Sequence, residues 1–302
     1  MNHFCPNLFV PGAAKSGTTS LHIMLDTHPD ICMSRIKEPV YWNKANFKSF
    51  NDKKKQWYHN LFEDKKAHVF GESTPSYMLY PDFIKNIKAT YDFEPKFIFI
   101  LRNPIDRAFS HYWWMIGLHK EKRTFKEAFE DDLKREFSPY KGYPDFYYHF
   151  GRYGHWISNF YKTFNPDHIK IITQESLRTD TNKTLNSCFE FLGLKAFNID
   201  TNISANKTSK LKYPLLYDFT KKISSGHYSF LEPIKSLIPK TYGRAIKNKL
   251  ENSSFINKKE VLEYSKPTAE ERAFLTSKYA KDVEMLKTIS GIEFKEWDDF
   301  NN

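Results

Sequence analysis

A glycine-containing loop at residues 11–19 follows the first apolar run of the chain, residues 8–10, and leads into a helical pattern. Within that pattern Leu21, Met24 and Leu25 fall on one helical face. Strand, loop and helix in this order build a cradle for phosphate, because the N–H groups of the loop and of the helix N-terminus can point at one anion.

The lysine of this loop does not stand where nucleoside triphosphate loops place it. Gly12 and Gly17 have the spacing of the G-x-x-x-x-G-K-[ST] motif, but Gly17 is followed by a threonine and the lysine is Lys15. We therefore expect a nucleotide to be bound for something other than transfer of a γ-phosphoryl group. The residues expected to hold its phosphate are Ala14, Lys15, Ser16, Gly17, Thr18 and Thr19.

The chain has 302 residues and a formal net charge of +10, and its three cysteines lie far apart. This length suits one large α/β domain. The positive charge favours anionic partners, although solvated surface lysines would explain it equally well. No zinc-binding cluster, signal peptide or membrane-spanning run is recognisable, so we expect a cytoplasmic protein with no transmembrane segment. A trimmed luminal domain of a membrane-anchored enzyme would look similar.

Short apolar runs bounded by turn residues alternate with helical patterns along the chain. This alternation predicts an α/β fold with a P-loop-like, mainly parallel central sheet and helices on both faces. We expect a single domain over residues 1–302, with a largely helical C-terminal part from about residue 211. The predicted strands are residues 8–10, 69–70, 97–101 and 169–172.

Helix boundaries are marked by capping residues. One helix is expected near residues 81–90, after a proline, and another after Asn103, an N-cap followed by proline. A later apolar stripe stops at Gly193, and a C-terminal stripe ends at Gly291. The C-terminal stripe consists of Leu275, Tyr279, Val283 and Leu286.

Aromatic side chains are concentrated in residues 138–156, where they mix with glycine, proline and basic residues. Such a mixture does not form a clean amphipathic helix. One interpretation is a loop pinned by its aromatic residues, and the other is a wall of a cleft that binds sugars or other rings.

A second group of candidate residues follows the predicted strand at 97–101. The strand ends at Arg102, whose guanidinium should emerge at the carboxyl edge of the sheet, where open α/β folds bind ligands. Ser110 lies two helical turns beyond Asn103 and so on the same face. Arg102 and Ser110 could therefore bind one anion together, although each is also common as a structural residue.

Taken together, the two groups imply a ligand with anionic groups at two separate places. At these motifs the chain resembles the sulfotransferases that use 3′-phosphoadenosine 5′-phosphosulfate (PAPS) and release 3′-phosphoadenosine 5′-phosphate (PAP). The resemblance implies the sulfotransferase fold, with the loop on the 5′-phosphosulfate and the second motif on the 3′-phosphate. The matching segments are Lys15-Ser-Gly-Thr-Thr19 and Arg102-Asn-Pro-Ile-Asp-Arg-Ala-Phe-Ser-His-Tyr112.

The resemblance extends over most of the chain. Segments 28–30, 71–77 and 191–194 are similar to glycan-directed members, and the C-terminal part resembles the family's last helix and tryptophan. Segment 206–210 looks like a basic loop that closes over the nucleotide, with Lys207 and Lys210 as its candidate ligands. A lysine stands there in place of the usual arginine, so bidentate contact is lost.

The resemblance also implies a mechanism, in-line transfer of a sulfuryl group to a hydroxyl or amine, without a required metal. Lys15 would stabilise charge on the leaving phosphate oxygen, and Glu38 would be the general base. Glu72 is the alternative base, although Ser73 stands where glycan-directed members often carry lysine. Glu38 could instead simply pair with the preceding lysine. The candidate acceptor-binding residues are Glu72, Arg152 and Tyr153.

Two other functions are compatible with parts of the pattern. A P-loop kinase or NTPase would use the same strand–loop–helix, but the lysine position and the lack of an acidic metal ligand at a strand end weigh against it. A non-enzymatic polyanion-binding protein fits the charge but gives no reason for Lys15 and Arg102 to follow two strands. The expected acceptor is a glycan, a glycolipid or a small hydroxylated molecule. We expect no nucleic acid partner, with peripheral membrane contact possible and the oligomeric state open.

Overall fold

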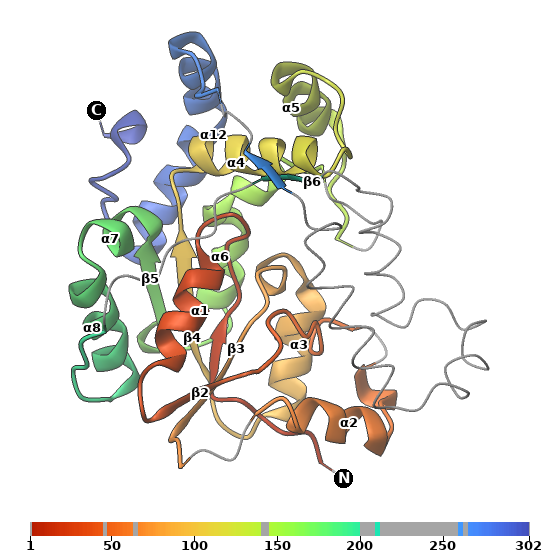
Figure 1. Ribbon diagram of the computed structural model, residues 1–302, viewed down its shortest axis with the longest axis vertical. Coiled ribbons are helices and arrows are strands. Elements are labelled where there is room, and N and C mark those ends of the chain that lie inside the picture. Colours follow the sequence, from red (N-terminus) through yellow and green to blue (C-terminus); the bar gives the residue numbers. More distant parts are fainter. Residues whose placement is uncertain are drawn as a thin grey trace.

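Five parallel strands form the central sheet, in the order β2-β3-β1-β4-β5 (Figure 1). The computed structural model describes residues 2–44, 47–62, 66–139, 145–199, 209–211, 259–261 and 265–301. The strands are β1 (Leu8–Val10), β2 (Ile31–Met33), β3 (Val69–Ser73), β4 (Lys96–Leu101) and β5 (Ile169–Thr173). A separate antiparallel pair joins β6 (Ser209–Leu211) to β7 (Lys259–Val261).

All four predicted strands are present in this sheet, and their parallel arrangement confirms the predicted fold class. The sequence did not reveal β2, an edge strand of three residues paired only with β3 through Ile31–Val69 and Met33–Gly71. Only Ile31 of its three residues is of a type enriched in strands, whereas two of the three residues of β1 are.

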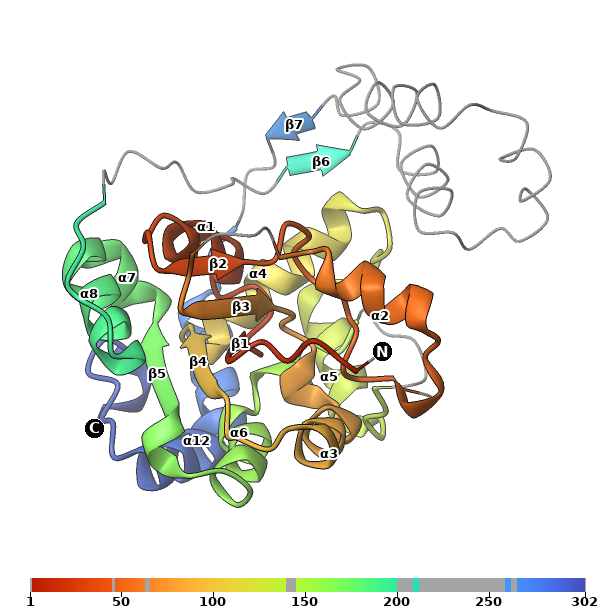
Figure 2. The same cartoon turned by 90° about the horizontal axis from the view of Figure 1, so that it is seen from below.

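Alternating side chains of the strands face two separate hydrophobic cores. Leu8 and Val10 of β1 pack with α1 (Thr18–Asp26) and α8 (Thr181–Leu192), whereas Phe9 points to the opposite core. The sheet therefore has helices on both faces, as Figure 2 shows, because both sides of its strands are apolar. The opposite core includes residues of α3 (Pro81–Thr90), α4 (Pro104–Gly117), α5 (Phe125–Lys134), α6 (Tyr153–Tyr161) and α12 (Ala269–Ser290).

Two shorter helices, α2 (Asp52–His59) and α7 (Gln174–Thr179), complete the described α-helices. The expected caps are present: the side chain of Asn103 accepts a hydrogen bond from the N–H of Ile105, and α8 is followed by Gly193 in the left-handed conformation. The predicted stripe of α12 is buried along its length, and the helix ends at Gly291. Short 3-10 turns lie at Phe47–Ser49, Tyr77–Leu79, His149–Gly151, Pro166–His168 and Asp298–Phe300.

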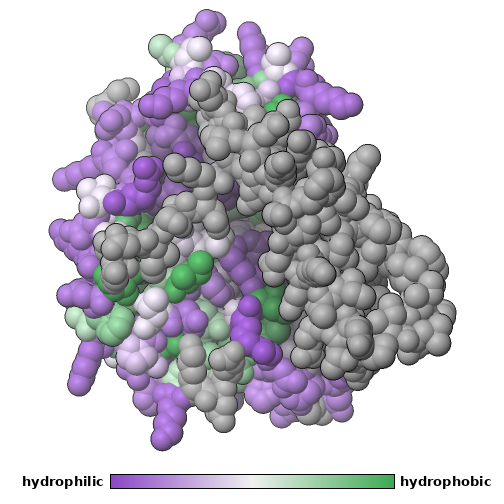
Figure 3. Space-filling model, in the orientation of Figure 1, coloured by the Kyte–Doolittle hydropathy of each residue, from purple (hydrophilic) through white to green (hydrophobic). Residues whose placement is uncertain are grey.

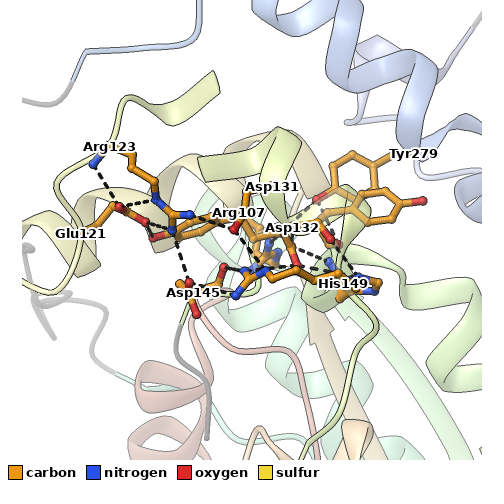
Figure 4. Close-up of polar contacts among 11 residues, drawn as sticks. Arg107, Glu121, Arg123, Asp131, Asp132, Asp145, His149 and Tyr279 are labelled. Atoms are coloured by element: carbon orange, nitrogen blue, oxygen red, sulfur yellow. Dashed lines mark hydrogen bonds and ion pairs between the residues drawn. The ribbon is translucent and has the colours of Figure 1, made fainter. Parts of the chain in front are cut away.

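The aromatic segment that the sequence singled out is fixed by buried rings and charges over its described part, residues 145–156. Tyr147 and Tyr153 are fully buried. The Asp132 carboxylate accepts the N–H of Tyr148, and Arg107 donates to the carbonyl of Tyr147, within the polar cluster of Figure 4. These contacts support the interpretation as a segment pinned by its aromatic residues, although Phe150 also reaches the main cavity.

The prediction of a largely helical part from about residue 211 falls mainly on residues 212–258, outside the described residues; α12 lies in its described portion. Within the described parts of the chain, no helix is long and apolar enough to cross a bilayer. Figure 3 shows that the described side chains on one face are mostly hydrophilic, with small hydrophobic spots between them.

The contact between α6 and α12 depends on a glycine. The N–H of Gly154 donates to the Asp282 carboxylate over 2.8 Å, and a Cβ at position 154 would lie 2.3 Å from the Asp282 carbonyl oxygen. Because backbone must move to admit it, Gly154→Ala should lower the free energy of unfolding by about 1–3 kcal/mol. Chemical denaturation measures this. Asn159→Ala, on the exposed side of α6, is the matched control, and equal stability of the two variants would contradict the packing described.

Candidate functional site

The candidate site lies where the direction of chain connection reverses in the sheet. From β1 the chain proceeds towards β2 on one side, and from β4 it proceeds to β5 on the other, so the loops after β1 and β4 diverge and leave a crevice between them. The N–H of Ala13 donates to the carbonyl of Ile100 over 2.8 Å, and the Ile100 N–H donates to the Gly12 carbonyl over 3.0 Å. The loop after β1 is thus fixed to the end of β4.

The N-terminus of α1 has no side-chain cap, like those of α3 and α6, but among the described α-helices only α1 begins after a left-handed glycine. Its N-cap is Gly17, with φ 93°, and no side chain caps it. Lys15 is also left-handed, with φ 68°. The first N–H groups of the helix can therefore meet an anion, together with the positive end of the helix dipole. By contrast, side chains cap α2, α5, α8 and α12 through Asn51, Thr124, Asp180 and Thr268.

A cavity of about 570 Å³ opens in front of this loop. Its walls come from the loop, from residues 37–40, from the middle and later turns of α4 and from Gln174 at the start of α7. Most of the residues predicted from sequence lie in its lining: Ala14, Lys15, Gly17, Thr18, Thr19, Glu38, Arg102 and Ser110.

The other predicted residues lie elsewhere. Ser16 is fully buried in the loop, and Lys207 falls outside the described residues. Lys210 is part of β6, beside α4, where only the course of the backbone is described (Figure 1). The three predicted acceptor-binding residues are absent from the cavity lining: Glu72 and Tyr153 are fully buried, and Arg152 lies against the ring of Tyr148.

Lys15 is largely removed from water in the cavity, and its pKa is lowered. Burial, followed by the nearby positive charges of Arg102 and Arg107, lowers the pKa of Lys15 to about 8, and only the Glu38 carboxylate among the nearby charges opposes this. Its ammonium group lies 5.0 Å from the centre of the Trp114 ring. Because the two arginines disfavour the charged form of Lys15, an anion in the cavity would stabilise that charge.

Glu38 also lines the cavity, and its side chain is about half exposed. Its carboxylate forms an ion pair with Lys37, and its backbone N–H donates to the carbonyl of Ser73 over 3.0 Å. The pairing with lysine that the sequence left open is therefore present. A half-exposed pair of this kind is weak and can be exchanged for another partner.

Arg102 and Ser110 also line a second hollow, of about 440 Å³. There Arg272 forms ion pairs with Asp106 over 2.9 Å and with Asp299 over 2.7 Å, which ties the C-terminal segment to α4. Lys15 and Arg102 thus line the main cavity together, and Arg102 extends the basic lining into the second hollow.

The sequence did not identify Trp114, Gln174 or Lys266 as neighbours of these hollows. Trp114 lies four residues after Ser110 on α4, so helical periodicity could have placed it beside the cavity. Gln174 and Lys266 come from distant parts of the chain, and no local pattern connects them to the loop.

Comparison with known proteins places this geometry in context. A family model described as "Sulfotransferase domain" matches residues 6–232. The membrane-associated sulfotransferase kil1 of Dictyostelium discoideum is 32% identical over 39% of this chain and 25% of its own length. The heparan sulfate glucosamine 3-O-sulfotransferase 3B1 of Homo sapiens is 25% identical over 67% of this chain and 50% of its own length. The chain thus spans half or less of these two relatives.

A solved structure shares the fold. The crystal structure of a sulfotransferase from Alicyclobacillus acidocaldarius superposes with a TM-score of 0.66 and 21% identity, covering 98% of this chain and 99% of that one. The parallel sheet with helices on both faces is therefore the architecture of a known sulfotransferase.

The lowered pKa of Lys15 can be measured without a ligand. The pH dependence of its acetylation by acetic anhydride, followed by mass spectrometry, should have a midpoint near pH 8, because only the neutral amine reacts. Lys53, exposed on α2, is the reference within the same digest. An anionic ligand in the cavity should shift the midpoint of Lys15 upward. A midpoint of Lys15 that coincides with that of Lys53 would contradict the electrostatics described here.

Proposed function

The chain belongs to the sulfotransferase domain family, and on this basis we propose that it transfers a sulfuryl group from PAPS to a carbohydrate or glycoconjugate acceptor. The observation that carries the proposal is the convergence of Lys15, Arg102 and Ser110 on one cavity from two strand ends. The accepting group is a hydroxyl or an amine.

The residues present fit the anionic groups of PAPS. Its 5′-phosphosulfate suits the uncapped N-terminus of α1 and the Lys15 ammonium, since both supply donors to phosphate oxygens. Its 3′-phosphate suits the Arg102 guanidinium and the Ser110 hydroxyl, which line both hollows. A nucleotide that bridges the two hollows would relieve the repulsion between Lys15 and Arg102.

In the transfer, the bond between sulfur and the bridging phosphate oxygen breaks while a bond from sulfur to the acceptor oxygen or nitrogen forms. Lys15 stabilises the charge that remains on the phosphate oxygen, and it carries a proton at neutral pH because its pKa is about 8. Glu38 accepts the proton of the acceptor group once its pairing with Lys37 is exchanged. Because a sulfuryl group carries less charge than a phosphoryl group, we expect no requirement for a metal.

The proposed acceptor class rests on relatives and on charge. The names of relatives matched over about two thirds of this chain assign heparan sulfate as their substrate. Beside the main cavity, a hollow of about 350 Å³ is lined by Arg35 and Lys37, which suit a sugar bearing carboxylate or sulfate groups. At position 73 a serine takes the place of a lysine common in glycan-directed members, so the sulfated position can differ from theirs.

Other expectations stay predictions. A cytoplasmic location rests on three separated cysteines, all free in the described structure. The kinase alternative explains only the strand–loop–helix, and the polyanion-binding alternative explains only the positive charge. Sulfuryl transfer gives both Lys15 and Arg102 a role.

Removal of the Lys15 ammonium should abolish transfer. We expect Lys15→Ala to reduce turnover by about 10²–10³-fold, because a preorganised donor to the leaving oxygen is lost. Turnover is measured with labelled PAPS and desulfated heparan sulfate, or with an extract of the source organism's glycans. The circular dichroism spectrum and melting temperature should stay those of the wild type. Near-normal transfer by the folded variant would refute the role of Lys15.

Replacement of Glu38 should separate binding from turnover. Glu38→Gln keeps the shape of the side chain but cannot accept a proton, so turnover should fall by about 10²–10⁴-fold. The affinity for PAP, measured by calorimetry, should not change, since in the proposed reaction Glu38 contacts the acceptor and not the nucleotide. Full activity of this variant would move the general base to another residue.

A further inference from the structure

The backbone that carries Glu38 is held in an unfavourable conformation. Glu38 and Val40 have φ angles of 60° and 51°, in the left-handed region that residues other than glycine seldom adopt. Such conformations persist only where surrounding contacts impose them, and they are common at functional sites. Something must therefore fix the segment that presents Glu38 to the cavity.

Hydrogen bonds secure this segment at both ends. At its start, the N–H of Glu38 donates to the carbonyl of Ser73, at the end of β3. At its end, the N–H groups of Tyr41 and Trp42 both donate to the hydroxyl oxygen of Tyr77, over 2.9 and 3.1 Å. A single buried tyrosine hydroxyl thus fixes the end of the turn formed by residues 38–42.

The Tyr77 hydroxyl is in turn oriented by Glu72. The carboxylate of Glu72 is fully buried and accepts hydrogen bonds from the hydroxyls of Tyr77 and Tyr58, the latter over 2.5 Å. The Tyr58 oxygen accepts the indole N–H of Trp42 over 2.7 Å. Each tyrosine therefore donates to Glu72 and accepts from the segment that follows Glu38.

This arrangement requires an acceptor at position 72. Each tyrosine has one hydroxyl hydrogen, and both oxygens already receive N–H groups from Tyr41 and Trp42. The Tyr58 hydroxyl points its hydrogen at Glu72, and the Tyr77 hydroxyl is also hydrogen-bonded to Glu72, whose carboxylate can accept two donors at once. A side-chain amide would present an N–H₂ group to one tyrosine and leave two donors facing each other.

Glu72 itself is removed from the chemistry. It is fully buried and does not line the cavity, so it cannot contact an acceptor. Burial raises the pKa of Glu72 to about 7, and the hydrogen bonds from the two tyrosines and Thr74 oppose that rise. These bonds stabilise the ionised form that accepts both hydroxyls.

We propose that Glu72 is a positioning residue of the transfer reaction, which orients the hydroxyls of Tyr58 and Tyr77 and through them fixes the turn that presents Glu38 to the cavity. The role rests on the proposed function, in which Glu38 accepts the acceptor's proton. Glu72 acts as a buried anionic hydrogen-bond acceptor beneath the site. This positioning role replaces the alternative in which Glu72 is the base.

Hydrogen exchange tests the anchor without any ligand. In Tyr77→Phe and in Glu72→Gln, the amides of Tyr41 and Trp42 should exchange about tenfold faster than in the wild type, because each variant weakens their shared acceptor. The matched control is Tyr91→Phe. It removes a buried hydroxyl near Trp42 that bonds the Pro6 carbonyl, and exchange at residues 41 and 42 should then stay unchanged.

Kinetics test its effect on the reaction. With labelled PAPS and desulfated heparan sulfate, both variants should lose about tenfold in kcat, while PAP affinity and melting temperature stay close to those of Tyr91→Phe. Unchanged exchange at residues 41 and 42 in Tyr77→Phe would overturn the proposal. So would a Glu72→Gln variant that loses all turnover while Tyr77→Phe stays fully active, since that pattern marks a base.

The two proposals fail in different ways. If the wild type neither binds PAP nor transfers sulfate, the proposed function is wrong, and hydrogen exchange still decides whether Glu72 anchors the turn. If the wild type transfers sulfate and Glu38→Gln does not, but Tyr77→Phe matches the wild type in exchange and turnover, only the positioning role is wrong.

Discussion

Two hydrogen bonds between the loop after β1 and Ile100 of β4 are the constraint on which the site depends. They hold the loop that carries Lys15 against β4, the strand that Arg102 directly follows. Because β1 and β4 are neighbours whose connections run in opposite directions, the crevice between them is open at the carboxyl edge of the sheet. Lys15 and Arg102 thereby face one cavity although 87 positions separate them, from 15 to 102.

The electrostatics of the cavity follow from this geometry. Lys15, Arg102 and Arg107 are brought together with partial loss of water, and the pKa of Lys15 falls in response. Arg107 is fully buried and donates a hydrogen bond to the Tyr147 carbonyl. It does not line the cavity, but its charge still acts on Lys15. The two anionic groups of the proposed donor would offset these positive charges.

Local patterns predicted four of the five strands of the central sheet, and most of the candidate site residues that they singled out line the cavity. The apolar runs of β1 and β4 identified these two strands, and Asn103 identified the start of α4. Helical spacing placed Ser110 beside Arg102. The three-residue strand β2 lacked such a signal. The environment of Glu72 could not be predicted from the sequence either. Its position near a strand end made it a candidate base. Its partner Tyr58 lies on α2, and only the tertiary structure shows that the two side chains meet in the core.

We expect the protein to recognise its donor through phosphates at two places, without a metal. The most direct measurement compares PAP with ATP in calorimetric titrations of the full chain in the presence of EDTA. PAP should bind at low micromolar concentration, and ATP should bind at least about tenfold more weakly, a difference of about 1.4 kcal/mol, because it lacks the 3′-phosphate for Arg102 and Ser110. Equal affinity for both nucleotides, or ATP binding that requires magnesium together with no binding of PAP, would contradict it.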